Sequence, residues 1–226
     1  MNVDTQRVRG RPSEGAREAV IEAAHALFMG RDYSRVSIED ILRRSGVSRG
    51  ALYHHFPTKL DLFLAVYKRS EMRVIGRIET QISDSAGPFE ALVDGARAYL
   101  ALCEADEEFR QIGLTQARVV LGWDGWRTAA SELGIAVVLA LVSAAIEADE
   151  LPRRDPETTA QILLGALFEA AMLIVVAEDR TTARERSELV IVDLLEGLRC
   201  LTDRSDRASR LEVIGPAFQR PLPGSA

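Results

Sequence analysis

The residues that follow Ser48 combine side-chain types that suit the recognition of double-stranded DNA. Arg49 can donate two hydrogen bonds to the O6 and N7 atoms of a guanine, or it can hold a phosphate. Small residues and further hydrogen-bond donors come directly after it: Gly50, Ala51, Tyr53, His54 and His55. The small residues let the backbone approach a nucleic acid, and the donors can bind bases or phosphates. The segment is therefore a candidate DNA-reading surface, although an ordinary solvated helix can carry the same residue types.

Signals for two short helices and a tight turn surround these residues. Ser37 and Asp40 have the spacing of a capping box, which predicts the start of a helix. Gly46 predicts its end, because glycine adopts the left-handed conformation at little cost. Ser48 then caps a second helix, and Pro57 ends it because proline disfavours a helical residue before it. This arrangement is a helix-turn-helix, whose second helix lies in the DNA major groove.

Residues 14 to 70 closely resemble the DNA-binding domain of the tetracycline-repressor (TetR) family of transcriptional regulators. The resemblance is carried by Ala24, Leu27, Phe28, Gly30, Tyr33, Ser37, Ile38, Ile41, Ser45, Gly46, Val47, Ser48, Gly50, Leu52, Tyr53, His55, Phe56, Lys59 and Leu62. The rest of the chain matches the family only in its length and its helical pattern. The family implies a homodimer that represses from a palindromic operator and is released by a small-molecule effector.

The resemblance also implies which residues contact DNA. Carried over by position, they are Ser37, Ser48, Arg49, Gly50, Ala51, Tyr53, His54 and Lys59. In this family Tyr53 and Lys59 typically meet phosphates, whereas Arg49 and Ala51 occupy positions where the base readout varies.

Charge is distributed unevenly along the 226 residues, whose formal net charge is −6. Residues 1–59 contain 10 Arg or Lys and 7 Asp or Glu, whereas residues 60–226 contain 18 and 27. DNA affinity depends on the local basic surface and not on the sum over the chain. The net acidity therefore does not exclude DNA binding, because the basic part coincides with the predicted helix-turn-helix.

The spacing of apolar residues and helix signals predicts an all-α fold of about nine helices. The expected divisions are a disordered basic arm (1–12), a three-helix DNA-binding domain (13–60), a helical effector-binding and dimerisation domain (61–203) and a disordered tail (204–226). In the arm, alternate arginines either reach a minor groove or stay in solvent. A break between two helices is expected at residues 122–125, and the last two helices are expected to start at Asp155 and Thr182.

Those last two helices are apolar on more than one side. The segment Ile162–Ala177 contains one charged residue, Glu169, and Leu189–Leu198 has apolar residues on several faces. A helix that packs on one side needs an apolar stripe only ~100° wide. A membrane span would need about 20 apolar residues, which is longer than this run. A homodimer through helices eight and nine accounts best for the pattern, with burial inside one subunit as the alternative; Leu195→Glu should then break the dimer.

The family resemblance implies an effector cavity in the middle of the second domain, and the shortage of polar groups in the seventh and eighth predicted helices favours a hydrophobic small molecule. Candidate ligand-binding residues are Tyr99, Cys103, Gln116, Trp123, Trp126, Phe168, Glu169 and Met172. Because an isolated charge in an apolar environment is costly, Glu169 is predicted to pair with Arg118 or Arg127. The alternative is that Glu169 points outward at the edge of the dimer interface.

The composition disfavours catalysis and metal binding. The three histidines do not form a joint metal site, because His54 and His55 are adjacent on a helix and diverge by roughly 100°. No glycine-rich nucleotide loop or activated nucleophile is visible, so no cofactor, metal or enzymatic activity is expected. The two cysteines lack redox spacing and residues 1–10 are polar, which favours a cytoplasmic protein without membrane contact. A helical ligand-binding or adaptor protein without regulatory DNA binding remains the alternative.

Overall fold

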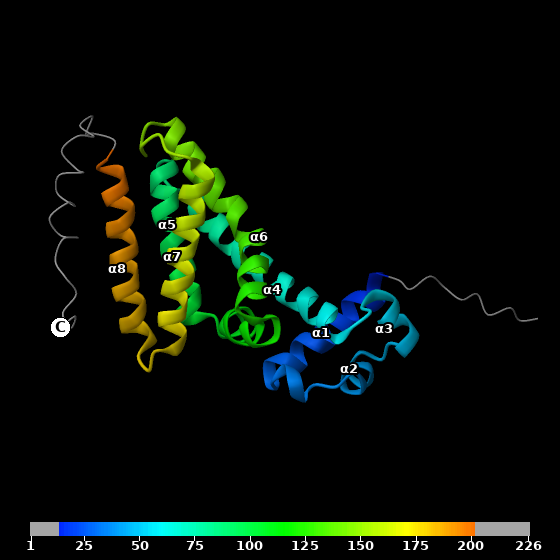
Figure 1. The fold of residues 1–226 in the computed structure, drawn as a ribbon. Helices are drawn as coiled ribbons and strands as arrows, with labels where there is room; N and C mark the ends of the chain where they lie inside the picture. The colour runs from blue at the N-terminus through cyan, green and yellow to red at the C-terminus, as the bar shows by residue number, and fades with distance from the viewer. Residues whose placement is uncertain (1–13, 202–226) are drawn as a thin grey trace, which may run out of the picture.

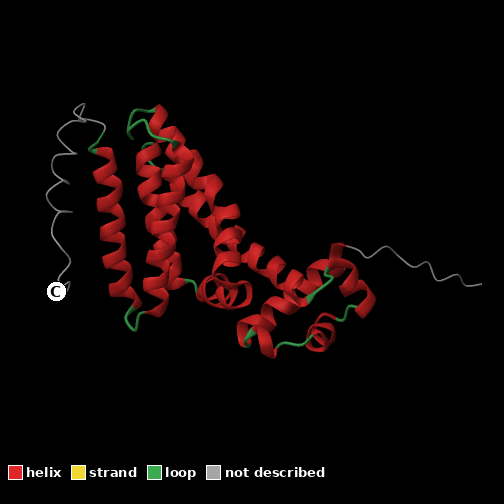
Figure 2. Ribbon diagram, in the orientation of Figure 1, coloured by secondary structure: helices red, strands yellow, loops and turns green. Residues whose placement is uncertain are grey.

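The computed structural model describes residues 14–201, and these form helices joined by short loops (Figures 1 and 2). The α-helices are α1 (Glu14–Gly30), α2 (Ile38–Ser45), α3 (Arg49–His55), α4 (Lys59–Ile82), α5 (Pro88–Ala105), α6 (Ala117–Glu147), α7 (Pro156–Val176) and α8 (Arg180–Arg199). A 3-10 turn, η1 (Tyr33–Arg35), and a π-helical segment, η2 (Phe109–Gln116), complete the order. The predicted all-α class is confirmed. The predicted arm and tail lie outside the described residues.

The helix-turn-helix forms as its capping signals predict. The Ser37 hydroxyl accepts a hydrogen bond from the Asp40 amide (3.1 Å), while the Asp40 carboxylate accepts one from the Ser37 amide (3.2 Å). Gly46 ends α2 in the left-handed conformation, with φ of 68°. The Ser48 hydroxyl then accepts from the Ala51 amide (3.3 Å) and opens α3. Local hydrogen bonding therefore sets both helix starts in this part of the chain.

Helix α4 belongs to both halves of the molecule. Its 24 residues make it about 36 Å long. It begins beside α1 and α3 and runs into the bundle formed by α5, α6, α7 and α8 (Figure 1). Buried residues along α4, among them Leu62, Phe63, Tyr67 and Val74, join one continuous hydrophobic core. A displacement of α4 in the bundle would therefore also shift its first turns, which pack against the helix-turn-helix.

Residues 14–201 form eight α-helices where about nine were predicted, because the two helices on either side of the predicted break count as one kinked helix, α6. Gly122 lies inside α6 with φ of 71° and ψ of 171°, so the chain kinks there and the helix resumes. The predicted start of the last helix at Thr182 is also wrong. Asp179 caps α8 by accepting from the Thr182 amide (3.1 Å), which begins the helix at Arg180. Aspartate is a good N-cap, and it lies one turn ahead of the weaker sequence signal.

Helices α7 and α8 lie side by side at the end of the molecule away from α2 and α3 (Figure 1). Each exposes large apolar side chains: Ile162, Leu173, Val176, Leu189, Val190 and Leu194. The helical stretches Phe109–Glu147 and Pro156–Val176 are long and apolar enough to cross a membrane, but core helices of soluble proteins share this property. The predicted test residue Leu195 is only 3% exposed, so it belongs to the protomer core.

Candidate DNA-binding surface and effector cavity

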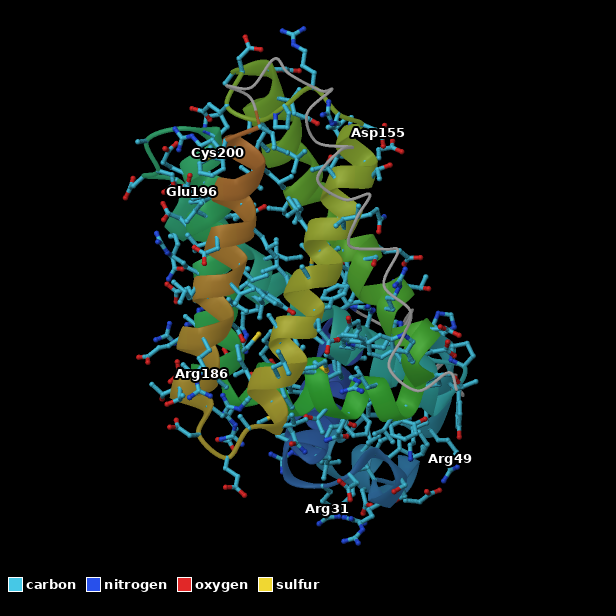
Figure 3. The ribbon with its side chains drawn as sticks, turned by 60° about the vertical axis from the view of Figure 1, so that its left-hand side comes forward. Arg31, Arg49, Asp155, Arg186, Glu196 and Cys200 are labelled. Atoms are coloured by element: carbon cyan, nitrogen blue, oxygen red, sulfur yellow. The ribbon has the colours of Figure 1, made fainter. Side chains whose placement is uncertain are left out.

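The predicted DNA-contacting residues lie together on α3 and at the adjoining helix starts. Leu52 and Phe56 are buried and hold the inner face of α3 against the core. The outer side is exposed or partly exposed, and it carries Ser37, Ser48, Arg49, Gly50, Ala51, Tyr53 and His54. Figure 3 shows Arg49 at the opposite end of the molecule from Glu196 of α8 and from Cys200, which follows that helix. The second helix of the helix-turn-helix is therefore free to enter a groove.

Arg49 is held by a carboxylate at the start of α2. Its Nη2 atom lies 2.6 Å from Oε1 of Glu39, and both side chains are more than half exposed. The hydrogen bond from Arg49 lowers the pKa of Glu39 and raises that of Arg49. A guanidinium has five N–H donors, so this pair orients Arg49 while leaving donors for a base or phosphate.

Lys59 makes contacts inside the protein that were not predicted from the sequence. Its Nζ atom donates to the carbonyl oxygens of Tyr33 and Val36, both at 2.7 Å, and lies 4.0 Å from the centre of the Tyr33 ring. Burial lowers the pKa of this ammonium group. An ammonium has three donors, so one remains for a phosphate beside the backbone amide at the start of α4. Within the protein, this side chain connects α4 to η1 and the residue that follows it.

A cavity of about 100 Å³ lies among α4, α5, α6, α7 and α8. Tyr99 and Phe168 are the two predicted ligand residues that line it. Most of its wall is aliphatic and was not predicted, for example Ile78, Leu92, Ala130, Val138, Leu164 and Leu167. These residues look like ordinary core positions in the sequence, because the void between them depends on how five helices pack.

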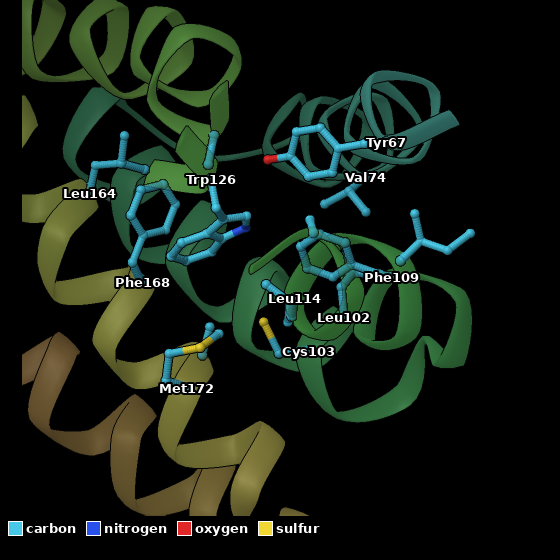
Figure 4. Close-up of a cluster of buried hydrophobic side chains, with 14 of the residues drawn as sticks. Tyr67, Val74, Leu102, Cys103, Phe109, Leu114, Trp126, Leu164, Phe168 and Met172 are labelled. Atoms are coloured by element: carbon cyan, nitrogen blue, oxygen red, sulfur yellow. The ribbon is translucent and has the colours of Figure 1, made fainter. Parts of the chain in front are cut away.

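The other predicted ligand residues do not line this cavity. The Gln116 amide is buried and donates to the Phe28 carbonyl (2.6 Å), which joins η2 to the end of α1. The Trp126 indole donates to the Gly113 carbonyl (2.9 Å) and packs against Phe168 in the core (Figure 4). Cys103 and Met172 are buried, whereas Trp123 is half exposed.

The predicted pairing of Glu169 with an arginine is wrong. Glu169 is exposed, and it has no ion-pair partner among residues 14–201. Arg118 instead contacts the Met172 sulfur and lies over the rings of Trp123 and Trp126. The exposed face of α7 lets Glu169 reach solvent in the protomer, as the alternative interpretation expects.

Sequence reasoning missed the acidic group that does line the cavity, Glu71 of α4. This residue is only 9% exposed, and burial raises its pKa to about 7, with the Tyr67 hydroxyl acting in the opposite direction. No basic side chain of the described residues forms an ion pair with it. Glu71 follows Tyr67 by four residues and precedes Val74 by three, so helical periodicity could have placed it on the buried face.

The nearby polar groups are neutral or unpartnered. The Tyr67 hydroxyl and the Ser70 hydroxyl are buried without a well-formed hydrogen bond. Burial raises the pKa of Tyr99 and of Cys103, which face Glu71 from α5. No group of three or more His, Cys, Asp or Glu side chains within residues 14–201 is arranged to hold a metal ion.

Comparisons with known proteins agree with this geometry. The profile of bacterial regulatory proteins of the tetR family matches residues 20–66, and a tetracyclin repressor-like C-terminal domain profile matches residues 89–198. Among curated proteins, the Transposon Tn10 TetC protein of Escherichia coli is 27% identical over 155 residues, covering 69% of this chain and 78% of its own. The A-factor receptor protein of Streptomyces griseus is 26% identical over 162 residues, covering 69% of this chain and 53% of its own.

A solved structure supports the same assignment across both domains. The crystal structure of a TetR-family transcriptional regulator from Pectobacterium atrosepticum superposes with a TM-score of 0.70 at 28% identity, covering 82% of this chain and 94% of that one. Members of the family regulate transcription by binding DNA and are not enzymes, and they act as dimers with small-molecule effectors. The two profile matches, the helix-turn-helix and the structural similarity over 82% of the chain together show that this chain belongs to the TetR family of transcriptional regulators.

Proposed function

We propose that this protein is a cytoplasmic homodimeric repressor that binds a palindromic operator and is released by a mainly apolar effector. The observation that carries the proposal is the path of α4. This helix starts at Lys59, which is fastened to the helix-turn-helix through two backbone carbonyls, and it borders the cavity with Glu71 and Ile78. A ligand that displaces α4 in the cavity would thereby move the base of the DNA-reading helix.

A second contact supports coupling between the two domains. Gln116 at the end of η2 bonds the Phe28 carbonyl, while Gly113 in the same segment lies against Glu71. Segments of π-helix are uncommon and are frequently found at functional sites. The cavity therefore has two mechanical connections to the DNA-binding domain, one through α4 and one through η2.

The DNA-binding part can be tested with the promoter region of the protein's own gene. Arg49→Ala should weaken operator binding by about ten-fold or more and relax sequence preference, because a bidentate contact to guanine is lost. Arg153 is a matched control, since it is also an exposed arginine beside an exposed carboxylate, Asp149, in the loop between α6 and α7. Arg153→Ala should leave binding unchanged. Failure of the unmodified protein to shift any promoter fragment would favour the adaptor alternative.

The proposed dimer would bury the exposed apolar faces of α7 and α8. Val190 is 57% exposed in the centre of this surface, so Val190→Asp should give monomers in sedimentation experiments. Met72 of α4 is also 57% exposed but lies on another face, and Met72→Asp should leave the dimer intact. Leu195→Glu is unsuitable, because its side chain packs inside the protomer. A stable monomer for the unmodified protein would remove the argument.

A further inference from the structure

The cavity is apolar except at one point, where α4 presents a carboxyl group. Glu71 contributes the one acidic side chain to its wall, and the wall has no lysine, arginine or histidine among the described residues. Tyr99 adds an aromatic ring with its hydroxyl, and Phe168 adds a second ring. The Glu71 carboxyl group is therefore the one group of this wall within residues 14–201 that can carry a negative charge near pH 7 and attract a cation.

The Glu71 carboxyl group lies against η2 at Gly113. Its Oε1 atom lies 3.1 Å from the place that a Cβ atom on Gly113 would occupy, and the Phe109 ring lies 2.6 Å from the same place. A side chain at residue 113 would therefore collide with both groups. The glycine leaves room for the carboxyl group between the π-helical segment and the cavity.

Three classes of ligand would interact with this wall in different ways. An anionic ligand would be repelled by Glu71 and would find no cation among the described lining residues. A neutral apolar ligand would fill the volume but would offer the Glu71 carboxyl group no partner beyond the Tyr67 hydroxyl, and it would keep water away from that group. A ligand with a protonated amine would satisfy the carboxylate and could also contact the aromatic faces of Tyr99 and Phe168.

We propose that the cavity binds a small, mainly apolar molecule carrying one protonated amine, and that Glu71 holds its ammonium group. This inference deepens the proposed effector function and rests on it for its regulatory meaning. An engineered apolar cavity of ~150 Å³ binds benzene, so a cavity of about 100 Å³ limits the buried part of the ligand to one ring or a short alkyl chain at most.

Binding should be linked to proton release. The groups that face Glu71 are Tyr67 on its own helix and Tyr99 and Cys103 on α5, and all three have a raised pKa and remain neutral near pH 7. Because the pKa of Glu71 is about 7, roughly half of the empty protein carries a proton there at that pH. An ammonium ion requires the carboxylate, so its binding displaces about half a proton per site into solvent.

The test uses benzylamine, benzyl alcohol and benzoate, which share one ring and differ in charge. Calorimetric titration of the full-length, DNA-free protein should give benzylamine an affinity about ten-fold or more above that of benzyl alcohol, with no binding of benzoate. Titration at pH 7 in two buffers of different ionisation enthalpy should reveal the proton release. Equal affinity for the amine and the alcohol, or no amine binding, would overturn the proposal.

The side chain is tested with Glu71→Gln, which keeps the shape and removes the charge. This variant should lose the preference for the amine and the proton release, whereas Glu169→Gln, with its exposed carboxylate, should keep both. If Glu71→Gln does not fold, the proton release measured on the unmodified protein tests the proposal instead. Amine binding without proton release at pH 7 would then contradict it. An unaltered amine preference in a folded Glu71→Gln protein would contradict the proposal.

Release from DNA separates this inference from the proposed function. Amine binding without release of operator DNA would leave the amine site in place and refute the effector role. Release by benzyl alcohol, together with no binding of benzylamine, would support an effector-responsive repressor and refute the amine site.

Discussion

The DNA-reading surface and the effector cavity are built in opposite ways. The first is assembled from residues 37–59, where each helix start is set by a hydrogen bond between residues three apart. The second takes its wall from five helices, and its lining extends from Glu71 to Leu195. Local chemistry determines one surface and tertiary packing determines the other, so single substitutions should have different consequences in the two regions.

The largest expected effect belongs to the cavity and concerns pH. The folded pKa of Glu71, about 7, lies above its ordinary value of 4.5, so the folded protein retains a proton that the unfolded chain loses. This stabilisation is complete below about pH 4.5 and is lost as the pH rises through about 7. The free energy of unfolding should therefore fall by about 3 kcal/mol across this window, since each pKa unit corresponds to ~1.4 kcal/mol.

Urea unfolding of Glu71→Gln at pH 5 and pH 8 tests this expectation. The variant should show a much flatter dependence on pH, because its side chain does not titrate. Glu169→Gln is the control and should retain the slope of the unmodified protein, since Glu169 is exposed. Asp40 does not interfere, because its pKa of about 2 confines its effect to lower pH. Identical slopes for Glu71→Gln and the unmodified protein would show that Glu71 is not buried in solution.

The next effect compares two glycines. A Cβ atom on Gly113 would lie 2.6 Å from the Phe109 ring, whereas one on Gly50 would meet nothing within 4 Å. Gly113→Ala should therefore cost about 1–3 kcal/mol of stability through overpacking. Gly50→Ala should stabilise α3 by up to ~1 kcal/mol and at the same time weaken operator binding, because the backbone no longer approaches DNA. Thermal unfolding and gel shifts should be measured on both variants. An equal loss of stability in Gly113→Ala and Gly50→Ala would contradict the difference expected between the two glycines.

These contrasts explain which parts of the molecule could be predicted from its sequence. Ser37, Gly46 and Ser48 specify their helix ends through neighbours in the chain, so the helix-turn-helix was predicted to within a residue or two. The predicted break near Gly122 is present as a local kink in α6, because the backbone of Gly122 has a positive φ of 71°. Such helix ends can be predicted from the sequence because the hydrogen-bond donor and acceptor that form each cap are only three or four residues apart.

The cavity shows the limit of such reasoning. The apolar sequence neighbours of Glu169 predict that it is buried, yet its side chain is exposed to solvent in the protomer. Glu71 has arginine and lysine nearby in the sequence and looks like a surface residue, although it is buried against α5 and η2. Apolar neighbours along the chain therefore do not indicate burial. The helix face does, and for Glu71 the spacing to Tyr67 and Val74 indicates the buried face of α4.

A smaller effect is expected at Lys59, which joins the two regions. Lys59→Met keeps the aliphatic length but leaves the carbonyls of Tyr33 and Val36 without their shared donor. Because the group is only partly buried, the loss of stability should be about 1 kcal/mol. The salt dependence of operator binding distinguishes the two roles. A slope that falls by about one unit would show that the ammonium neutralises a phosphate, whereas an unchanged slope would show that it acts through η1.

The smallest effect separates helix capping from DNA contact at Ser48. Its hydroxyl accepts one hydrogen bond, of 3.3 Å, from the Ala51 amide, so Ser48→Ala should cost about 0.5–1 kcal/mol of stability. Ser48→Asp should preserve the cap, because aspartate is as good an N-cap as serine, and should keep the stability of the unmodified protein. Its negative charge would nevertheless repel a phosphate at the start of α3 and lower operator affinity. Thermal unfolding and fluorescence anisotropy on the two variants therefore measure the two roles independently. Unchanged operator affinity for Ser48→Asp would remove Ser48 from the DNA-contacting surface and leave it a structural role alone.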